Sequence, residues 1–148
     1  MRLFSRPPSD KITYTRRPGA YGVIRRGDKL LVTEQTSINV EIQLPGGGID
    51  PGEGPLTALH RECLEETGWR IAVDSRIGTY QRYVYMPEYD MWAHKICHIY
   101  LCRPGLRLGP PREAGHKALW MHWQDAVAQF PDSGSRFVTS EIMRRMTA

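Results

Sequence analysis

Cysteine is scarce in this 148-residue chain, and its arrangement argues against two kinds of structure. The three cysteines, Cys63, Cys97 and Cys102, are odd in number and include no C-x-x-C pair. A disulfide framework needs paired cysteines and a cysteine zinc site needs closely spaced ones, so the sequence indicates neither. We expect all three to be small buried residues.

Long apolar runs are also missing. No segment approaches the ~20 apolar residues that cross a bilayer, and the N-terminal octapeptide MRLFSRPP lacks the apolar core of a signal peptide. We therefore expect a cytoplasmic protein with no membrane partner. With 41% hydrophobic residues, the chain can still build one domain with its own core, and it is short for two.

Acidic residues are nearly absent from the N-terminal end. Against Asp10 alone, residues 1–26 carry seven basic residues: Arg2, Arg6, Lys11, Arg16, Arg17, Arg25 and Arg26. This excess suits an anionic partner, either a polyphosphate substrate or a nucleic acid, but a solvated, partly disordered leader explains it equally well. The sequence contains no zinc-finger spacing, RNP-type aromatic motif or helix-turn-helix signature that would support nucleic-acid binding.

Prolines divide the chain into a leader and a domain. Pro7, Pro8 and Pro18 punctuate an extended basic leader over residues 1–18, and a single domain follows over residues 19–148. Because the leader has little apolar material to pack, we expect its first part to be dispensable for folding.

The start of the domain has the pattern of a hairpin, a loop and a helix. The segments AYGVI (20–24) and KLLVTE (29–34) flank a Gly-Asp turn and predict a β-hairpin. The Gly/Pro-rich loop QLPGGGIDPGEGP comes next. Pro55 suits the first turn of a helix and Gly68 suits its C-terminal cap, so a helix of three to four turns is expected to end near Thr67.

The rest of the chain alternates between strand and helix patterns. β-branched and aromatic residues predict strands in WRIAV, IGTYQRYVYM, HKICHIYLC and ALWMHW, with a loop at PEYDMWAH. The segments QDAVAQF and SRFVTSEIMRRM have the pattern of closing helices. This order predicts an α/β fold with helices packed on a mixed sheet.

The segment RECLEETG raises an electrostatic problem. In a helix, Glu62, Glu65 and Glu66 fall within an arc of about 100° and therefore share one face. They repel each other, and the last helical turn also faces the negative end of the helix dipole. A solvated face partly neutralised by Arg61 and Arg70 is one explanation.

A divalent cation removes the conflict more completely. Mg²⁺ takes hard oxygen ligands, and it relies on a few carboxylates together with substrate phosphates. The glycines Gly46, Gly47 and Gly48 let the main chain approach this face closely, so a backbone carbonyl can join the ligands.

The spacing of these residues resembles a known motif. Gly47, Glu53 and the segment Arg61–Trp69 match the Nudix box of Nudix hydrolases, with five residues between the first two and seven before Arg61. Cys63 and Trp69 stand where the family usually has aliphatic residues. Cys63 still fills a small apolar site, whereas Trp69 needs a larger pocket, and neither replaces a charged group.

The resemblance implies a fold, a reaction and a set of roles. The implied fold is the Nudix fold, an α/β/α sandwich around a mixed sheet. The implied reaction is Mg²⁺-dependent hydrolysis of a nucleoside diphosphate linked to another moiety X, with Mn²⁺ as a substitute for Mg²⁺. The resemblance makes Glu62, Glu65, Glu66 and the Gly46 carbonyl metal ligands, Arg61 the residue that orients Glu62, and Glu53 an acidic neighbour of the metal site. Relatives differ in which carboxylate takes the proton of the attacking water, and we name Glu62 as the candidate.

Several residues outside the box are further candidates. The segment PPREAGHKALWMHW offers Glu113 as an additional acidic residue and His116 as its substitute, although an exposed loop charge is the simpler interpretation. Glu88 and Asp90 are alternatives. Arg17 could bind phosphate, and four aromatic residues could stack on a base or fill the core: Tyr83, Tyr85, Trp92 and Trp120. A Cys97–His98 dyad is rejected, because adjacent strand residues point to opposite faces.

The box says little about X. Candidate substrates are oxidised or ordinary nucleoside triphosphates, dinucleoside polyphosphates, nucleotide sugars and a triphosphorylated RNA 5′ end, for which the sequence gives no specific support. A homodimer is left open. The alternative function is a non-catalytic Nudix module that binds a nucleotide or a regulatory partner, and the intact set of box carboxylates argues against it.

Overall fold

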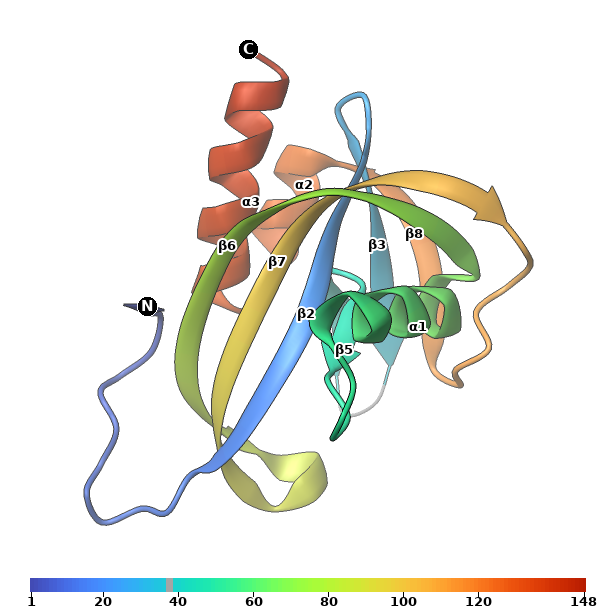
Figure 1. The fold of residues 1–148 in the computed structure, drawn as a ribbon. Helices are drawn as coiled ribbons and strands as arrows, with labels where there is room; N and C mark the ends of the chain where they lie inside the picture. Colours follow the sequence, from blue (N-terminus) through green and yellow to red (C-terminus); the bar gives the residue numbers. More distant parts are fainter. Residues whose placement is uncertain (37–38) are drawn as a thin grey trace.

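The chain folds around one mixed β-sheet with helices on both faces (Figure 1). The computed structural model describes residues 1–36 and 39–148. Its strands are β1 (Arg2–Leu3), β2 (Thr15–Arg26), β3 (Lys29–Thr36), β4 (Val40–Gln43), β5 (Gly46–Gly48), β6 (Trp69–Met86), β7 (Met91–Arg107) and β8 (His116–His122). Its helices are α1 (Pro55–Thr67), the short 3-10 helix η1 (Pro87–Tyr89), α2 (Trp123–Gln129) and α3 (Ser133–Met146).

The sheet is mixed because its central strand has neighbours of both directions. The strand order is β1-β6-β7-β2-β3-β4, with β5 added to β2 and β8 added to β3. Strand β2 runs parallel to β7 and antiparallel to β3 and β5. Helix α1 covers one face, and α2 and α3 cover the other (Figure 1). The predicted α/β/α sandwich is confirmed.

Alternating side chains of the central strands feed two separate cores. Val23 and Leu30 pack toward α2 and α3, whereas their neighbours Ile24 and Leu31 pack toward α1. A strand buried on both faces has a continuous apolar run rather than an alternating one, which explains the segments AYGVI and KLLVTE. The sequence predictions of the hairpin and of buried cysteines are confirmed.

Most predicted elements are present, with three differences in extent. Helix α1 has the predicted limits, and the two closing helices are present. The segments WRIAV and IGTYQRYVYM form one strand, β6, because β-bulges near Ser75 and Ile77 let the chain continue without a turn. The expected loop PEYDMWAH is shorter, since β7 begins at Met91, and Trp123 belongs to α2 rather than to a strand. No helix in the described ranges is long and apolar enough to cross a membrane.

The first residues are more structured than the leader prediction implied. Strand β2 begins at Thr15. Pro18 fits within it because its nitrogen, like its carbonyl, faces Ile49, whose N–H donates to that carbonyl, so the missing N–H costs no hydrogen bond to β7. Strand β1 pairs in parallel with β6, and the Phe4 ring lies 5.4 Å from that of Tyr80. The segment therefore makes more contacts than its small apolar content predicted, and its dispensability for folding stays a prediction.

Candidate active site

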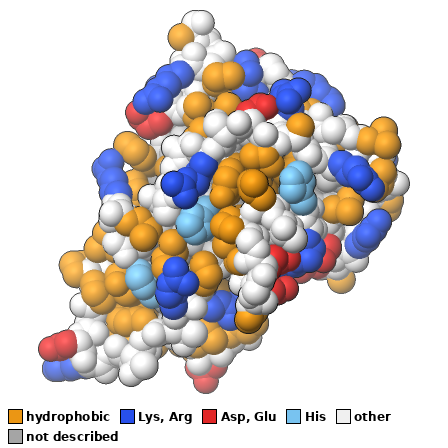
Figure 2. Space-filling model, in the orientation of Figure 1, with side chains coloured by type: hydrophobic (Ala, Val, Ile, Leu, Met, Phe, Trp, Pro, Cys, Tyr) orange, Lys and Arg blue, Asp and Glu red, His pale blue; other side chains and the backbone are white. Residues whose placement is uncertain are grey.

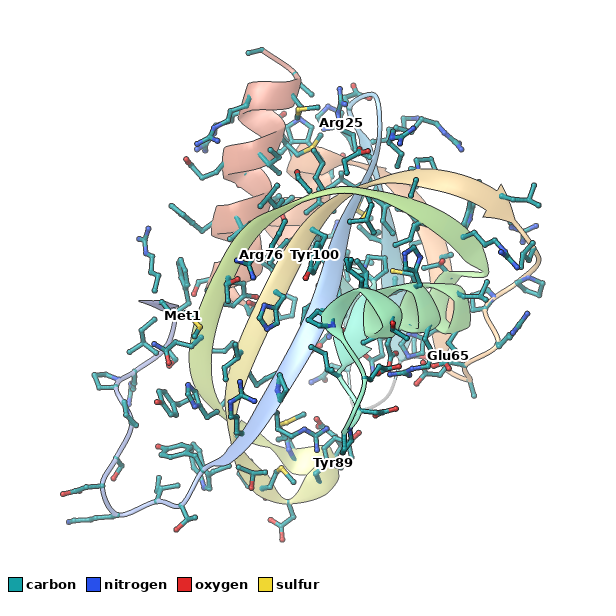
Figure 3. All side chains as sticks on the ribbon, in the orientation of Figure 1. Met1, Arg25, Glu65, Arg76, Tyr89 and Tyr100 are labelled. Atoms are coloured by element: carbon teal, nitrogen blue, oxygen red, sulfur yellow. The ribbon has the colours of Figure 1, made fainter. Side chains whose placement is uncertain are left out.

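Helix α1 presents its carboxylates beside the glycine-rich loop. Leu59 and Cys63 are fully buried against the sheet, which turns the acidic side of the helix toward the loop. A Cβ atom at Gly47 would lie 2.6 Å from the Glu62 carboxyl carbon, so only glycine lets this carboxylate approach the loop backbone. Figure 3 shows Glu65 on the same side of α1, among other acidic side chains.

Arg61 joins the loop to the helix. Its Nε and Nη2 donate to the two carboxylate oxygens of Glu53, each at 2.9 Å, and Nη1 donates to Oε1 of Glu62 at 2.9 Å. Nη2 also donates to the Gly48 carbonyl. These bonds hold the pKa of Glu53 at about 2, with Arg61 as the main cause. Arg61 therefore fixes the orientation of Glu62, and Glu53 is an anchor for Arg61.

Glu66 is a buried acid with few partners. Its exposed fraction is 4%, and Oε1 accepts from the Gly46 N–H at 3.1 Å. Burial raises the pKa of Glu66 to about 9, and the nearby Glu62 and Glu113 add to the increase. Glu66 is thus mainly protonated at neutral pH unless a cation lies beside it. Gly46 contacts this acid through its N–H, and the predicted metal contact of its carbonyl stays a prediction.

Backbone hydrogen bonds bring the distant residue Glu113 to the helix. The Glu65 carbonyl, near the end of α1, accepts from the N–H groups of Arg112 at 2.9 Å and Glu113 at 3.1 Å. Helix carbonyls at this position lack an intrahelical partner, so a passing loop can satisfy them. The same loop leads into β8, where Nδ1 of His116 lies 3.6 Å from Oε2 of Glu66.

The side chains form two overlapping groups of potential ligands. Glu62, Glu65 and Glu113 bring three oxygens within 4.8 Å of one another, and Glu66, Glu113 and His116 do the same with their ligand atoms. Within the described ranges, the buried Nδ1 of His116 has no hydrogen-bond partner. Clustered hard oxygens and an unpaired nitrogen fit a divalent cation such as Mg²⁺ or Mn²⁺. These residues could hold a metal ion.

The carboxylates open into a cavity that continues toward α3. The first cavity, of about 480 Å³, is lined by Glu62, Glu66 and Glu113 and by the cations Arg17 and Lys95, together with Glu41 and Glu88. A second cavity, of about 310 Å³, shares a wall with it that includes Tyr21, Gln43 and Lys95, and reaches Tyr80, Phe130 and Asp132. The site thus combines clustered carboxylates, two cations and an adjoining mixed polar and aromatic space.

A family model for the NUDIX domain matches residues 15–140 of the chain. The chain belongs to the NUDIX family. The match includes the glycine-rich loop, α1 and the segment that contains Glu113 and His116.

Curated NUDIX relatives align with part of the chain. A Bacillus subtilis (strain 168) protein named "Putative 8-oxo-dGTP diphosphatase" is 36% identical over 74 residues, which cover 50% of this chain and 49% of that protein. An RNA pyrophosphohydrolase of Helicobacter pylori (strain G27) is 44% identical over 57 residues, which cover 35% of this chain and 37% of that protein. The chain therefore spans about half or less of the relatives it matches.

Solved structures support the NUDIX fold. A NUDIX hydrolase from Nitrosomonas europaea superposes with a TM-score of 0.72 at 19% identity, covering 88% of this chain and 90% of that chain. A MutT NUDIX hydrolase from Burkholderia pseudomallei gives a TM-score of 0.63 at 20% identity, covering 86% of this chain and 98% of that chain. At these identities the likeness concerns the fold alone.

The candidate residues outside the NUDIX box do not all lie in one place. Arg17, Glu88, Glu113 and His116 line the first cavity. Tyr83 lies outside both cavities, on the other face of β6, where its ring stacks on that of His94. Three further candidates make other contacts: Trp120 packs against Trp69, Trp92 is 40% exposed, and Asp90 accepts from the Tyr85 hydroxyl.

Lys95 is the residue that sequence reasoning missed. It lies in β7 and lines both cavities, and its pKa is raised, first by the adjacent Tyr21 phenol, so it is a cation at neutral pH. A signal was present in the segment HKICHIYLC, because alternation places Lys95 on the same face as the buried Cys97. A lysine on an inward-facing position indicates a function or a buried partner.

Proposed function

We propose that this protein is a divalent-metal-dependent pyrophosphohydrolase that cleaves the phosphoric anhydride bond of a nucleoside 5′-polyphosphate. The observation that carries the proposal is one cavity lined both by clustered carboxylates and by the cations Arg17 and Lys95. Glu62, Glu65, Glu66 and Glu113 would hold Mg²⁺, or Mn²⁺ in its place. When bound, the metal supplies charge neutralisation and an acidified water.

The side chains of the protein supply the remaining requirements of phosphoryl transfer. Arg17 and Lys95 line the same cavity as the carboxylates, where they can bind phosphate oxygens. Glu62 is the proposed general base. Arg61 occupies its Oε1, which leaves Oε2, beside Gly47, to accept the proton of the attacking water. Burial raises the pKa of Glu62 despite the nearby Arg61, which makes it a stronger base.

The second cavity supports the assignment of a nucleoside. It adjoins the first cavity, and its lining includes the rings of Tyr21, Tyr80 and Phe130 and the carboxylate of Asp132. Nucleotide sites combine an apolar space for the base with a few polar groups that fix its orientation. The names of the relatives suggest two substrates for comparison, 8-oxo-dGTP and the 5′ end of RNA.

The alternative is a NUDIX module that binds a nucleotide without cleaving it. The complete acidic set favours catalysis, because nucleotide binding alone would be weakened by four clustered carboxylates. Binding without turnover on the panel described next would establish the alternative.

Product formation across a panel tests the proposal. Nucleoside triphosphates, 8-oxo-dGTP, a dinucleoside polyphosphate, a nucleotide sugar and 5′-triphosphorylated RNA are incubated with Mg²⁺ or Mn²⁺, and the cleavage products are separated from the intact substrates by ion-exchange chromatography. We expect turnover of at least one substrate, abolished by EDTA and reduced by about two orders of magnitude or more in Glu66→Gln. Activity that survives exhaustive chelation contradicts the proposal. Lys29→Gln, at an exposed position outside both cavities, is the control.

A further inference from the structure

Among the described residues, no helix covers one half of the sheet on the side of α1. Helix α1 packs on β2, β3, β5, β8 and the first residues of β6, and the remaining length of β6 and β7 lies beside it. We define the open face as the side chains of Tyr14, Arg16, Arg76, Tyr83, Trp92, His94 and His98. Figure 2 shows basic and histidine side chains among hydrophobic ones over this half of the sheet, with acidic side chains toward the margins.

The open face is separate from the catalytic cavities. Arg82, Lys95 and Cys97 line the cavities, and Tyr83, His94 and His98 alternate with them along β6 and β7. Successive strand residues point to opposite faces, so the two sets occupy opposite sides of the sheet.

Aromatic rings form a connected surface on the open face. Tyr83 stacks on His94 with ring centroids 4.3 Å apart and planes at 7°, and the edge of Tyr14 packs on Tyr83 at 4.8 Å. Trp92 adjoins Tyr14 at 6.1 Å and remains 40% exposed. Exposed rings on a sheet surface offer stacking sites to unpaired bases.

Positive charge lies beside the rings. Arg16 and Arg76 are exposed, and within the described ranges neither forms an ion pair. Burial lowers the pKa of His98, and the charges of Arg76 and then Arg16 lower it further, which places both guanidinium groups near its ring. Figure 3 shows Arg76 on this half of the sheet. Uncompensated cations complement an anionic partner.

We propose that the open face binds single-stranded nucleic acid, with a base stacked on the exposed Trp92 and backbone phosphates on Arg16 and Arg76. Stacking requires unpaired bases, which a duplex does not offer. Because Arg16 and Arg76 form no ion pair within the described ranges, they favour a polyanion over a protein partner of mixed charge.

Fluorescence anisotropy with a 3′-labelled, 5′-hydroxyl RNA 12-mer in EDTA tests the binding without any hydrolysis. We expect the double variant Arg16→Gln/Arg76→Gln to bind about tenfold more weakly and to lower the salt slope by about 1.4, for two lost phosphate contacts. Arg107→Gln/Arg145→Gln removes the same charge from exposed positions elsewhere and is expected to bind like wild type. Trp92→Ala should weaken binding about fivefold or more, and Trp92→Phe should restore most of it.

Three results overturn the proposal. They are no binding at about 100 µM protein in low salt, equal losses in the two double variants, and binding of a duplex 12-mer as tight as that of the single strand. The first result would exclude nucleic acid as the partner of the open face, and a protein partner would then be the alternative. Hydrolysis of free nucleotides should be unchanged in Arg16→Gln/Arg76→Gln, so failure of this proposal is distinguishable from failure of the proposed activity.

Discussion

At the residue scale, Glu66 combines deep burial with a role that requires charge. Glu66 has a pKa of about 9 in the folded protein and the ordinary pKa of 4.5 in the unfolded chain, so the folded protein keeps this proton to a higher pH. The stability that this proton provides is fully present below pH 4.5 and is lost as the pH rises through about 9. The metal-free protein should therefore become less stable across this window.

Glu66→Gln should remove this dependence, because the amide has no proton to lose. In EDTA, we expect the melting temperature of wild type to fall relative to that of the variant between pH 6 and pH 9. The corresponding loss in the free energy of unfolding is at most about 1.4 kcal/mol per pH unit. Thermal scans at half-unit intervals measure the difference. Parallel curves for the two proteins would mean that Glu66 is already ionised in the folded state.

Neutralising Glu65 tests the repulsion between the box carboxylates. Glu65 repels the neighbouring Glu62 carboxylate and opposes the helix dipole, against one ion pair with Arg61 at 3.6 Å that is partly exposed and worth little. We expect Glu65→Gln to raise the melting temperature in EDTA, and Mg²⁺ to stabilise wild type more than the variant. A lower melting temperature for the variant in EDTA would show that the Glu65 carboxylate makes a net stabilising contact.

Lys95 is expected to act on substrate binding. Its ammonium group lies at the wall common to the two cavities, so it can contact the phosphate next to the nucleoside. Lys95→Met should raise KM for a nucleoside triphosphate about tenfold, because the substrate loses one charge-assisted hydrogen bond. Steady-state kinetics with Lys29→Met as the control measure the effect, and an unchanged KM would exclude Lys95 from phosphate binding.

At the element scale, the end of α1 and the loop before β8 depend on each other. Gly68 has φ +76°, and a Cβ atom there would lie 1.9 Å from the Gly109 carbonyl oxygen. Gly68→Ala should therefore displace the loop that the Glu65 carbonyl holds, and with it Glu113. We expect a loss of stability of more than about 1 kcal/mol together with a loss of activity.

Gly52→Ala is the matched control for this prediction. Gly52 also has a positive φ, of +82°, but a Cβ atom there meets open space. It should therefore show only the conformational cost of about 1 kcal/mol. Urea denaturation compares the two variants. Equal destabilisation would mean that the loop at Gly109 moves away from the new Cβ atom without a loss in the free energy of unfolding.

The elements that the sequence predicted well are those set by local chemistry. Pro55 and Gly68 mark the limits of α1, and the carboxylate spacing is fixed by the helical period. The continuation of β6 could not be predicted, because its bulges depend on pairing with β7 rather than on a local turn signal. The position of Glu113 depends on long-range hydrogen bonds to the Glu65 carbonyl, which leave no pattern in the sequence.

At the scale of the whole molecule, the N-terminal segment and the catalytic cavity are separable. Phe4 packs between Tyr80 and Phe137, and the Arg2 guanidinium lies 4.2 Å from the Phe137 ring. The first residue of the chain to line the cavities is Arg17. We propose that residues 1–12 stabilise the domain without taking part in its chemistry.

Deletion of residues 1–12 should lower the melting temperature by a few degrees and leave kcat largely unchanged. The loss follows from the removal of Phe4 from its ring contacts. Phe4→Ala should reproduce most of the shift within the full-length chain. Loss of activity at an unchanged melting temperature would instead assign the segment to the catalytic site.

The burial of all three cysteines makes the protein suited to site-selective thiol labelling. Burial raises the pKa of Cys63, Cys97 and Cys102, so that each is both covered and protonated, and thiol reagents require a thiolate that they can reach. A cysteine introduced at an exposed position would consequently react first, with the native residues left in place. A fluorophore on Arg16→Cys would then report on the open face, and one on Arg17→Cys, the next residue, would report on the cavity.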